Sequence, residues 1–162
     1  MIPADERQFL DAGIFIGAIL LGDQRHPEAY PLVEAARRGD FLSCTSVAVL
    51  SEVYGALTWA GSVTPHTPAD AARSVRELVE PPSAIEVLQD SLEVGLLHLR
   101  LAERHHLTAR RIHDARHAAT ALQNNVTHVY TYDPADWHDF EADGIVIVGP
   151  PSTLAALAPT QP

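Results

Sequence analysis

The sequence predicts an α/β fold, a three-layer α/β/α sandwich around a mostly parallel five-stranded sheet. Short apolar segments with strand character alternate along the chain with segments of helical periodicity, which is typical of a parallel sheet covered by helices on both faces. We find no internal repeat and no linker long enough to divide the 162 residues. We therefore expect one domain over residues 1–150 and a proline-rich tail over residues 151–162.

The first predicted elements are a strand at residues 7–10 and an apolar helix at residues 12–21. The helix has no polar face, so we expect it to be buried. A second helix is predicted to begin near Pro27, because proline suits the first helical position, and to run to about Arg38. Gly39 then ends it.

The next pair of elements is a strand at residues 41–44 and a helix that reaches about residue 60. Thr45 or Ser46 can cap the amino end of this helix with its hydroxyl. An apolar stripe at i, i+4 and i+8 supports the helix, and its members are Val49, Val53 and Leu57.

The second half of the chain continues the alternation. A fourth helix is predicted at residues 69–79, and Pro81 and Pro82 stop it. The remaining expected elements are a strand at 85–88, helices at 91–106 and 111–123, and strands at 128–131 and 145–148.

Four acidic residues lie inside apolar sequence, and they are Asp11, Glu52, Asp114 and Asp133. Burying an ionised carboxylate costs several kcal/mol unless a cation or a metal compensates it. Asp11 directly follows the first strand and Asp133 follows the fourth by two residues, so both lie where the carboxyl ends of parallel strands form sites. Glu52 and Asp114 are expected in the first turns of helices that could start at this edge. The four acids can therefore converge on a divalent metal.

The chemistry of the ligands favours Mg²⁺ or Mn²⁺, which carboxylates and water suit, over zinc. His113 and His117 have the i, i+4 spacing of some zinc sites, but no glutamate base lies between them. Two ions at one site could activate a water and stabilise the leaving oxygen of a phosphodiester. Taken singly, Asp114 could merely stabilise a helix N-terminus and Glu52 could be a solvated helix residue.

Composition restricts the partners and the compartment. The formal net charge of −10 argues against a broad nucleic-acid surface, although arginines cluster locally and bound metals can neutralise a phosphate. Cys44 is the single cysteine and is expected to be a buried, inert thiol. The apolar run at residues 12–21 is shorter than the roughly 20 residues that span a bilayer, and the residues before it carry no net positive charge. We therefore expect a cytoplasmic protein with no membrane partner.

Four motifs in this order resemble the PIN-domain nucleases, most closely the VapC-type ribonuclease toxins of toxin-antitoxin modules. The motifs are FLDAGIFI, TSVAVLSEV, IHDARHAATAL and TYDPADW, and the resemblance covers roughly residues 8–150. It implies a five-stranded α/β/α fold and a Mg²⁺- or Mn²⁺-dependent endoribonuclease. It also implies a homodimer that a cognate antitoxin keeps inactive.

The resemblance also implies roles for particular residues. Asp11, Glu52, Asp114 and Asp133 match the acidic quartet of the family, Asp136 matches a further acid, and Thr131 matches a supporting hydroxyl residue. One departure is Gly13, since many relatives carry a polar residue two places after the first acid.

The substrate-binding residues have to be inferred differently, because the chain has no lysine. The arginines nearest in sequence to the expected metals are Arg110, Arg111 and Arg116, and we expect them to contact RNA. Two alternatives remain open. The chain could be a non-catalytic PIN-like module that binds RNA or protein, or a DNA nuclease with the same fold, although it looks too short for duplex-binding elements.

Overall fold

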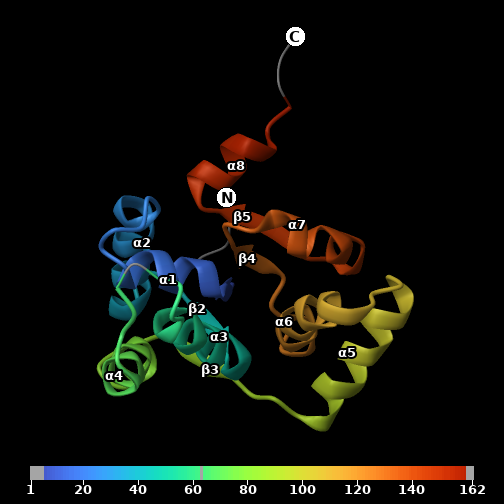
Figure 1. The fold of residues 1–162 in the computed structure, drawn as a ribbon. Coiled ribbons are helices and arrows are strands. Elements are labelled where there is room, and N and C mark those ends of the chain that lie inside the picture. Colours follow the sequence, from blue (N-terminus) through green and yellow to red (C-terminus); the bar gives the residue numbers. More distant parts are fainter. Residues whose placement is uncertain (1–5, 63, 160–162) are drawn as a thin grey trace.

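A central sheet of five parallel strands organises the computed structural model, which describes residues 6–62 and 64–159 (Figure 1). The strand order is β3-β2-β1-β4-β5. The strands are β1 (Gln8–Leu10), β2 (Ser43–Ser46), β3 (Glu86–Leu88), β4 (His128–Tyr130) and β5 (Val146–Gly149). The prediction of a five-stranded α/β fold is confirmed, and within the described residues the sheet is entirely parallel.

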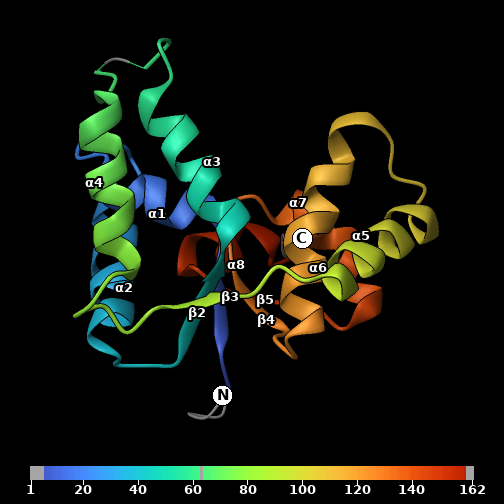
Figure 2. The same ribbon diagram turned by 90° about the horizontal axis from the view of Figure 1, so that it is seen from below.

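The helices form two groups beside the sheet. Figure 2 shows α1 to α4 gathered on one side of the strands and α5 and α6 on the other, as a sandwich requires. Their bounds are α1 (Ala12–Ile19), α2 (His26–Arg38), α3 (Val47–Thr58), α4 (Pro68–Val79), α5 (Leu92–Arg104) and α6 (Ile112–Gln123). No helix of the described residues is long and apolar enough to cross a membrane.

The core lies between the central strands and the first helix. Phe9 and Leu10 of β1 and Phe15 of α1 are fully buried, as expected for the first part of the apolar helix. Its predicted end at residue 21 is wrong, because α1 ends at Ile19 and Leu21 is 84% exposed. Cys44 is also buried, as predicted, and burial raises the pKa of its thiol to about 12. At that pKa the thiol stays protonated and unreactive at neutral pH.

The predicted second strand is wrong by two residues. The strand is Ser43–Ser46, and Leu42, which the prediction included, is 48% exposed. Polar side chains can occupy this central strand because they are hydrogen-bonded: the Thr45 hydroxyl donates to the carbonyl of Leu10 at 3.0 Å.

Four short helical segments had no counterpart in the sequence prediction. The helix α7 and a 3₁₀ helix follow Asp133. The expected tail begins with another helix, α8, and hydrogen bonds of Ser152 and Thr153 connect it to the rest of the fold. The bounds are η1 (Ala109–Arg111), α7 (Pro134–Trp137), η2 (His138–Asp143) and α8 (Pro151–Leu157).

Candidate active site

Asp11 lies at the carboxyl end of the central strand and begins α1. Its carboxylate Oδ1 accepts a hydrogen bond from the Ala12 backbone N–H at 2.8 Å, so Asp11 is the N-cap of the helix. Its own N–H donates to the carbonyl of Tyr130, which ties it to the end of β4. Only 8% of the residue is exposed. The acid therefore has a fixed position at the edge of the sheet.

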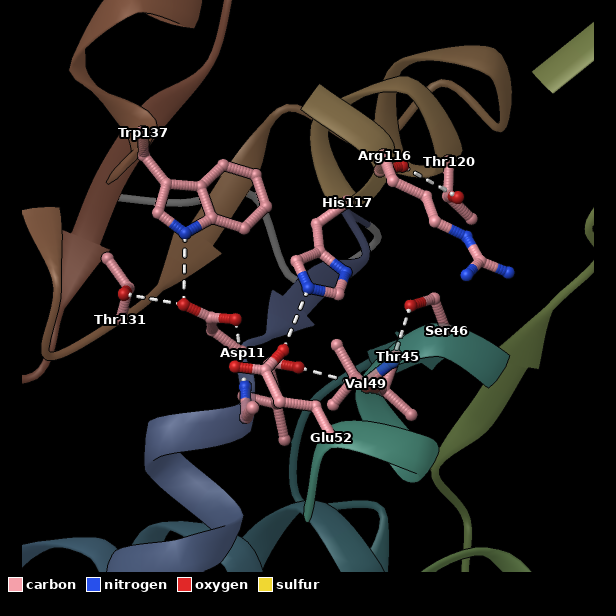
Figure 3. A network of polar contacts seen from close by, with 12 residues as sticks. Asp11, Thr45, Ser46, Val49, Glu52, Arg116, His117, Thr120, Thr131 and Trp137 are labelled. Atoms are coloured by element: carbon pink, nitrogen blue, oxygen red, sulfur yellow. Dashed lines mark hydrogen bonds and ion pairs between the residues drawn. The ribbon is translucent and has the colours of Figure 1, made fainter. Parts of the chain in front are cut away.

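The second oxygen of Asp11 has two further donors (Figure 3). The Thr131 hydroxyl donates to Oδ2 at 2.7 Å and the Trp137 indole N–H donates to it at 3.0 Å. Thr131 Oγ1 in turn accepts from the backbone N–H of Asp133 at 2.9 Å. One hydroxyl thus connects two of the predicted acids.

Glu52 comes from the exposed side of α3. Ser46 caps this helix by accepting from the Val49 N–H at 3.1 Å, in agreement with the predicted cap. Val49 and Val53 face the core, so Glu52 points outward, where its Oε2 lies 3.0 Å from Nε2 of His117 on α6 (Figure 3). This contact joins the two helices across the candidate site.

Of His117 and Glu52, His117 has the less exposed side chain. Burial disfavours its charged form, but the hydrogen bond to Glu52 and the nearby Asp11 carboxylate outweigh this effect and raise the pKa of His117. Within the described residues its buried Nδ1 has no hydrogen-bond partner. His117 therefore supplies positive charge to the site when it is protonated.

The remaining acids have raised pKa values. Burial is the largest cause for Asp114 and Asp133, and other carboxylates of the group add to it. The pKa of Asp136 rises to about 6, because of burial first and then because of repulsion from Asp114, Asp133, Asp11 and Glu52. Carboxylates that repel one another in this way share a common region and favour a cation between them.

A small pocket of about 130 Å³ collects these side chains. All five predicted acids line it, together with His117, which the sequence analysis expected at the mouth of the pocket as a minor phosphate contact, and with four further residues. The lining residues are Asp11, Ala12, Gly13, Glu52, His113, Asp114, His117, Asp133, Asp136 and Trp137.

The donor set of this pocket fits a hard divalent cation, because its charged groups are carboxylates. In the part of the chain that the structure describes, no three of the potential ligands are already grouped tightly enough to hold one ion. The chemistry of the donors thus suits a metal, and binding would require small movements of the exposed acids.

The predicted substrate-binding arginines lie outside the pocket lining. Arg111 forms an ion pair with Asp139, and Arg116 pairs with Asp90 at 2.9 Å. Arg110 is exposed in η1. Of the three, Arg111 acts on a predicted acid: its charge lowers the pKa of Asp114 against the larger effect of burial, which raises it.

Trp137 is the residue that sequence reasoning missed. Its indole is buried, and the indole N–H donates a hydrogen bond to Asp11, which lies 126 positions earlier in the sequence. The only signal was its place in the TYDPADW motif, because a buried indole N–H normally needs an acceptor.

Comparisons with known proteins identify the family and the fold of the chain. A family model for the PIN domain matches residues 9–141. The sarcin-ricin-loop-cleaving toxin VapC20 of Mycobacterium tuberculosis matches with a TM-score of 0.64 and 22% identity, over 88% of this chain and 99% of that chain. No match was found among curated proteins.

Two further solved structures share the fold at lower identity. VapBC2 of Rickettsia felis, bound to a DNA fragment from its promoter, matches with a TM-score of 0.60 and 16% identity over 88% of this chain and 97% of that chain. A toxin-antitoxin complex from Klebsiella pneumoniae matches with a TM-score of 0.56 and 18% identity over 86% of this chain and 96% of that chain.

Proposed function

The chain belongs to the PIN domain family, and from this premise we propose that it is a metal-dependent endoribonuclease that acts as the toxin of a toxin-antitoxin pair. The observation that carries the proposal is the gathering of all five predicted acids in one pocket at the carboxyl edge of the sheet. Sites in parallel α/β sheets form at this edge. A non-catalytic scaffold would have no reason to maintain the repulsion among these acids.

The roles of the residues follow from their surroundings. We assign Asp11 and Asp114 as the central metal ligands, and Glu52, Asp133 and Asp136 as groups that complete the coordination or hold bound water. Thr131 and Trp137 orient Asp11 by donating hydrogen bonds to it. Bound Mg²⁺ or Mn²⁺ would supply Lewis-acid stabilisation of charge on a phosphodiester and a more acidic water.

His117 and Glu52 have a separate role in this proposal. The Glu52 hydrogen bond holds the imidazole at the pocket, so a protonated His117 offers a charge to an arriving phosphate.

The proposed substrate is RNA rather than duplex DNA. With a net charge of −10, the surface cannot hold a long duplex by electrostatic attraction alone. A looped or folded single-stranded segment can instead reach a small pocket and be recognised by shape and stacking. VapC20, which shares the fold, is described as cleaving an RNA loop, which supports this choice.

We further propose a cognate antitoxin as the protein partner. The related Klebsiella pneumoniae structure is a toxin-antitoxin complex. In this chain an apolar groove of about 560 Å³ is lined by residues that include Ile19, Leu20, Leu21 and His66, and it can receive apolar side chains of such a partner. An arginine of the antitoxin could then fork onto the acids and displace the metal.

The direct test is cleavage of structured RNA by the purified chain with Mg²⁺ or Mn²⁺, with chelator as a control. We expect metal-dependent cleavage that Asp114→Asn reduces at least about a hundredfold, because one lost electrostatic contact in a catalytic site has effects of this order. Unchanged cleavage by Asp114→Asn would show that the site is misassigned. RNA binding without any cleavage would favour the non-catalytic alternative.

A further inference from the structure

A second, larger groove adjoins the acidic pocket. Its volume is about 990 Å³, and its lining residues include Arg25, Glu28, Tyr132, Asp133 and Ser152. Asp133 lines both the groove and the acidic pocket. A chain of nucleotides with one phosphate at the acids would therefore continue into this groove.

Arg25 is held rigidly at the groove. Its Nε donates to Asp23 Oδ1 at 2.9 Å and its Nη2 donates to Asp23 Oδ2 at 2.6 Å, a two-point pairing that fixes the plane of the guanidinium. The guanidinium carbon lies 5.4 Å from the centre of the Tyr132 ring, which supports the cation from one face. The Arg25 side chain is 29% exposed, so it can be reached from the groove.

The third nitrogen of Arg25 lies beside Gly13 and Asp133. A Cβ atom on Gly13 would lie 3.4 Å from Arg25 Nη1 and 3.5 Å from Asp133 Oδ2, which are ordinary van der Waals distances. The glycine therefore lets the arginine and the acid lie close to the start of α1. Gly13 lines the acidic pocket and Arg25 lines the groove, so Nη1 lies where the two meet.

Charge identifies the side chain of the groove that can bind a phosphate. Asp23, Glu28 and Asp133 also line the groove, and Arg25 is its positively charged lining residue. Asp23 uses Nε and Nη2 of Arg25, and Nη1 takes no part in that pairing. Arg111 and Arg116, the arginines expected from the sequence, lie outside both linings. Arg25 is therefore the arginine best placed to reach a phosphate beside the acids.

We propose that Arg25 is a substrate-binding residue, whose Nη1 donates to an RNA phosphate next to the scissile one, where the groove meets the acidic pocket. The inference rests on the proposed ribonuclease function and assigns part of its substrate site. Arg25 then supplies a polar group at the place where this chain has Gly13.

One variant and a matched control test the arginine. Arg25→Ala removes the donor. Arg38→Ala is the control, because Arg38 also pairs at 2.6 Å with an acid two residues away, Asp40.

The measurement is the affinity for a labelled single-stranded RNA across a salt series, with Ca²⁺ in place of Mg²⁺ and a gel that verifies intact RNA. We expect Arg25→Ala to weaken binding about tenfold, as loss of a charged hydrogen bond does, and to reduce the salt slope by about 0.7. Arg38→Ala should bind like the parent. Mn²⁺ affinity, measured by calorimetry, should not fall in Arg25→Ala.

The outcomes separate this inference from the proposed function. If Arg25→Ala binds RNA as Arg38→Ala does, with the same salt slope, while the parent cuts RNA, the assignment of Arg25 is wrong and the function stands. If Arg25→Ala loses Mn²⁺ affinity and keeps the parental salt slope, Arg25 only positions Asp133, and the inference is overturned. A parent that neither binds nor cuts RNA overturns the proposed function and this inference with it.

Discussion

Asp11 shows how a buried acid can be tolerated before any metal binds. Its oxygens accept hydrogen bonds from the Ala12 N–H, the Thr131 hydroxyl and the Trp137 indole, which replace water around the charge. The same donors make Asp11 a structural residue as well as a proposed ligand. A loss of activity in an Asp11 variant would therefore combine the loss of a proposed metal ligand with a change in the stability of the fold.

Asp11→Asn should lower stability more than Asp114→Asn. An asparagine must turn its NH₂ group toward at least one of the donors around Asp11, which leaves buried groups unpaired at a cost of about 1–3 kcal/mol. Asp114 is partly exposed, so Asp114→Asn should change the free energy of unfolding by less than about 1 kcal/mol. Urea unfolding without metal measures both values. Equal stability of the two variants would mean that the hydrogen bonds to Asp11 contribute little.

Asp136 makes a pH-dependent contribution in the absence of metal. Burial and the neighbouring acids raise its pKa from 3.8 to about 6, so the folded chain binds the proton more tightly than the unfolded chain does. This stabilisation is complete below the unfolded pKa of 3.8 and is lost as the pH rises through about 6. The carboxyl group is partly desolvated in the pocket, but the residue as a whole is exposed and water screens the charges, so we expect this contribution to be less than about 1 kcal/mol.

Melting temperatures in chelator across this pH range test the contribution of Asp136. The melting temperature of Asp136→Asn should fall less than that of the parent as the pH rises from about 4 to about 6. Mn²⁺ should raise the melting temperature of the parent more at neutral pH than at acid pH, because metal and proton compete for the same oxygens. Parallel curves for the parent and the variant would contradict the assigned pKa.

Among the secondary-structure elements, α8 is attached in part through one glutamate. Glu28 of α2 accepts hydrogen bonds from the Ser152 N–H at 3.0 Å, from the Ser152 hydroxyl at 2.6 Å and from the Tyr132 hydroxyl at 3.0 Å. Glu28→Ala should therefore increase amide hydrogen exchange across α8 severalfold without affecting β1. Glu34→Ala on the same helix is the control, since Glu34 pairs only with Arg37 in the described residues. Equal exchange in both variants would show that Glu28 does not anchor α8.

The order and type of most elements could be predicted from sequence, because apolar periodicity and capping residues are local signals. The position of β2 could not. Phe41 and Leu42 are the apolar residues there, but the strand is Ser43–Ser46, whose pairing with β1 places Ser43 opposite Gln8 and Cys44 opposite Phe9. That register depends on a partner strand more than thirty residues away, and a local pattern contains no information on it.

The residues of the candidate site were likewise only partly predictable from the sequence. The acids could be predicted, because an acid directly after an apolar strand is conspicuous in sequence. Trp137 and Arg25 could not be placed, because the first acts on an acid 126 positions away and the second depends on a ring at Tyr132. Tertiary packing alone brings such groups together.

At the scale of the whole molecule, strand order explains where the pocket lies. The chain builds β1, β2 and β3 toward one edge and then returns to place β4 and β5 on the other side of β1. The order therefore reverses between β1 and β4, and crevices form at such switch points. Asp11 follows β1, and Thr131 and Asp133 follow β4, so the topology itself brings them together.

The surface of α5 bears on the expected homodimer. Leu92, Leu96 and Leu99 recur on one face of the helix at i, i+4 and i+7, and they are 73%, 47% and 58% exposed. An apolar stripe of this kind is stabilised when a second surface covers it. We therefore propose that two copies associate through α5.

Salt should distinguish this association from RNA binding. Each copy carries a net charge of −10, so the two copies repel, and salt should screen the repulsion and strengthen the dimer. Salt should weaken RNA binding. Leu96→Glu places a charge in the stripe. It should raise the dissociation constant of the dimer at least about tenfold, which sedimentation velocity would detect as a shift to monomer. Leu154→Glu, at a 41% exposed position of α8, should leave the equilibrium unchanged. If both variants stay dimeric, or if salt dissociates the dimer, α5 is not the interface.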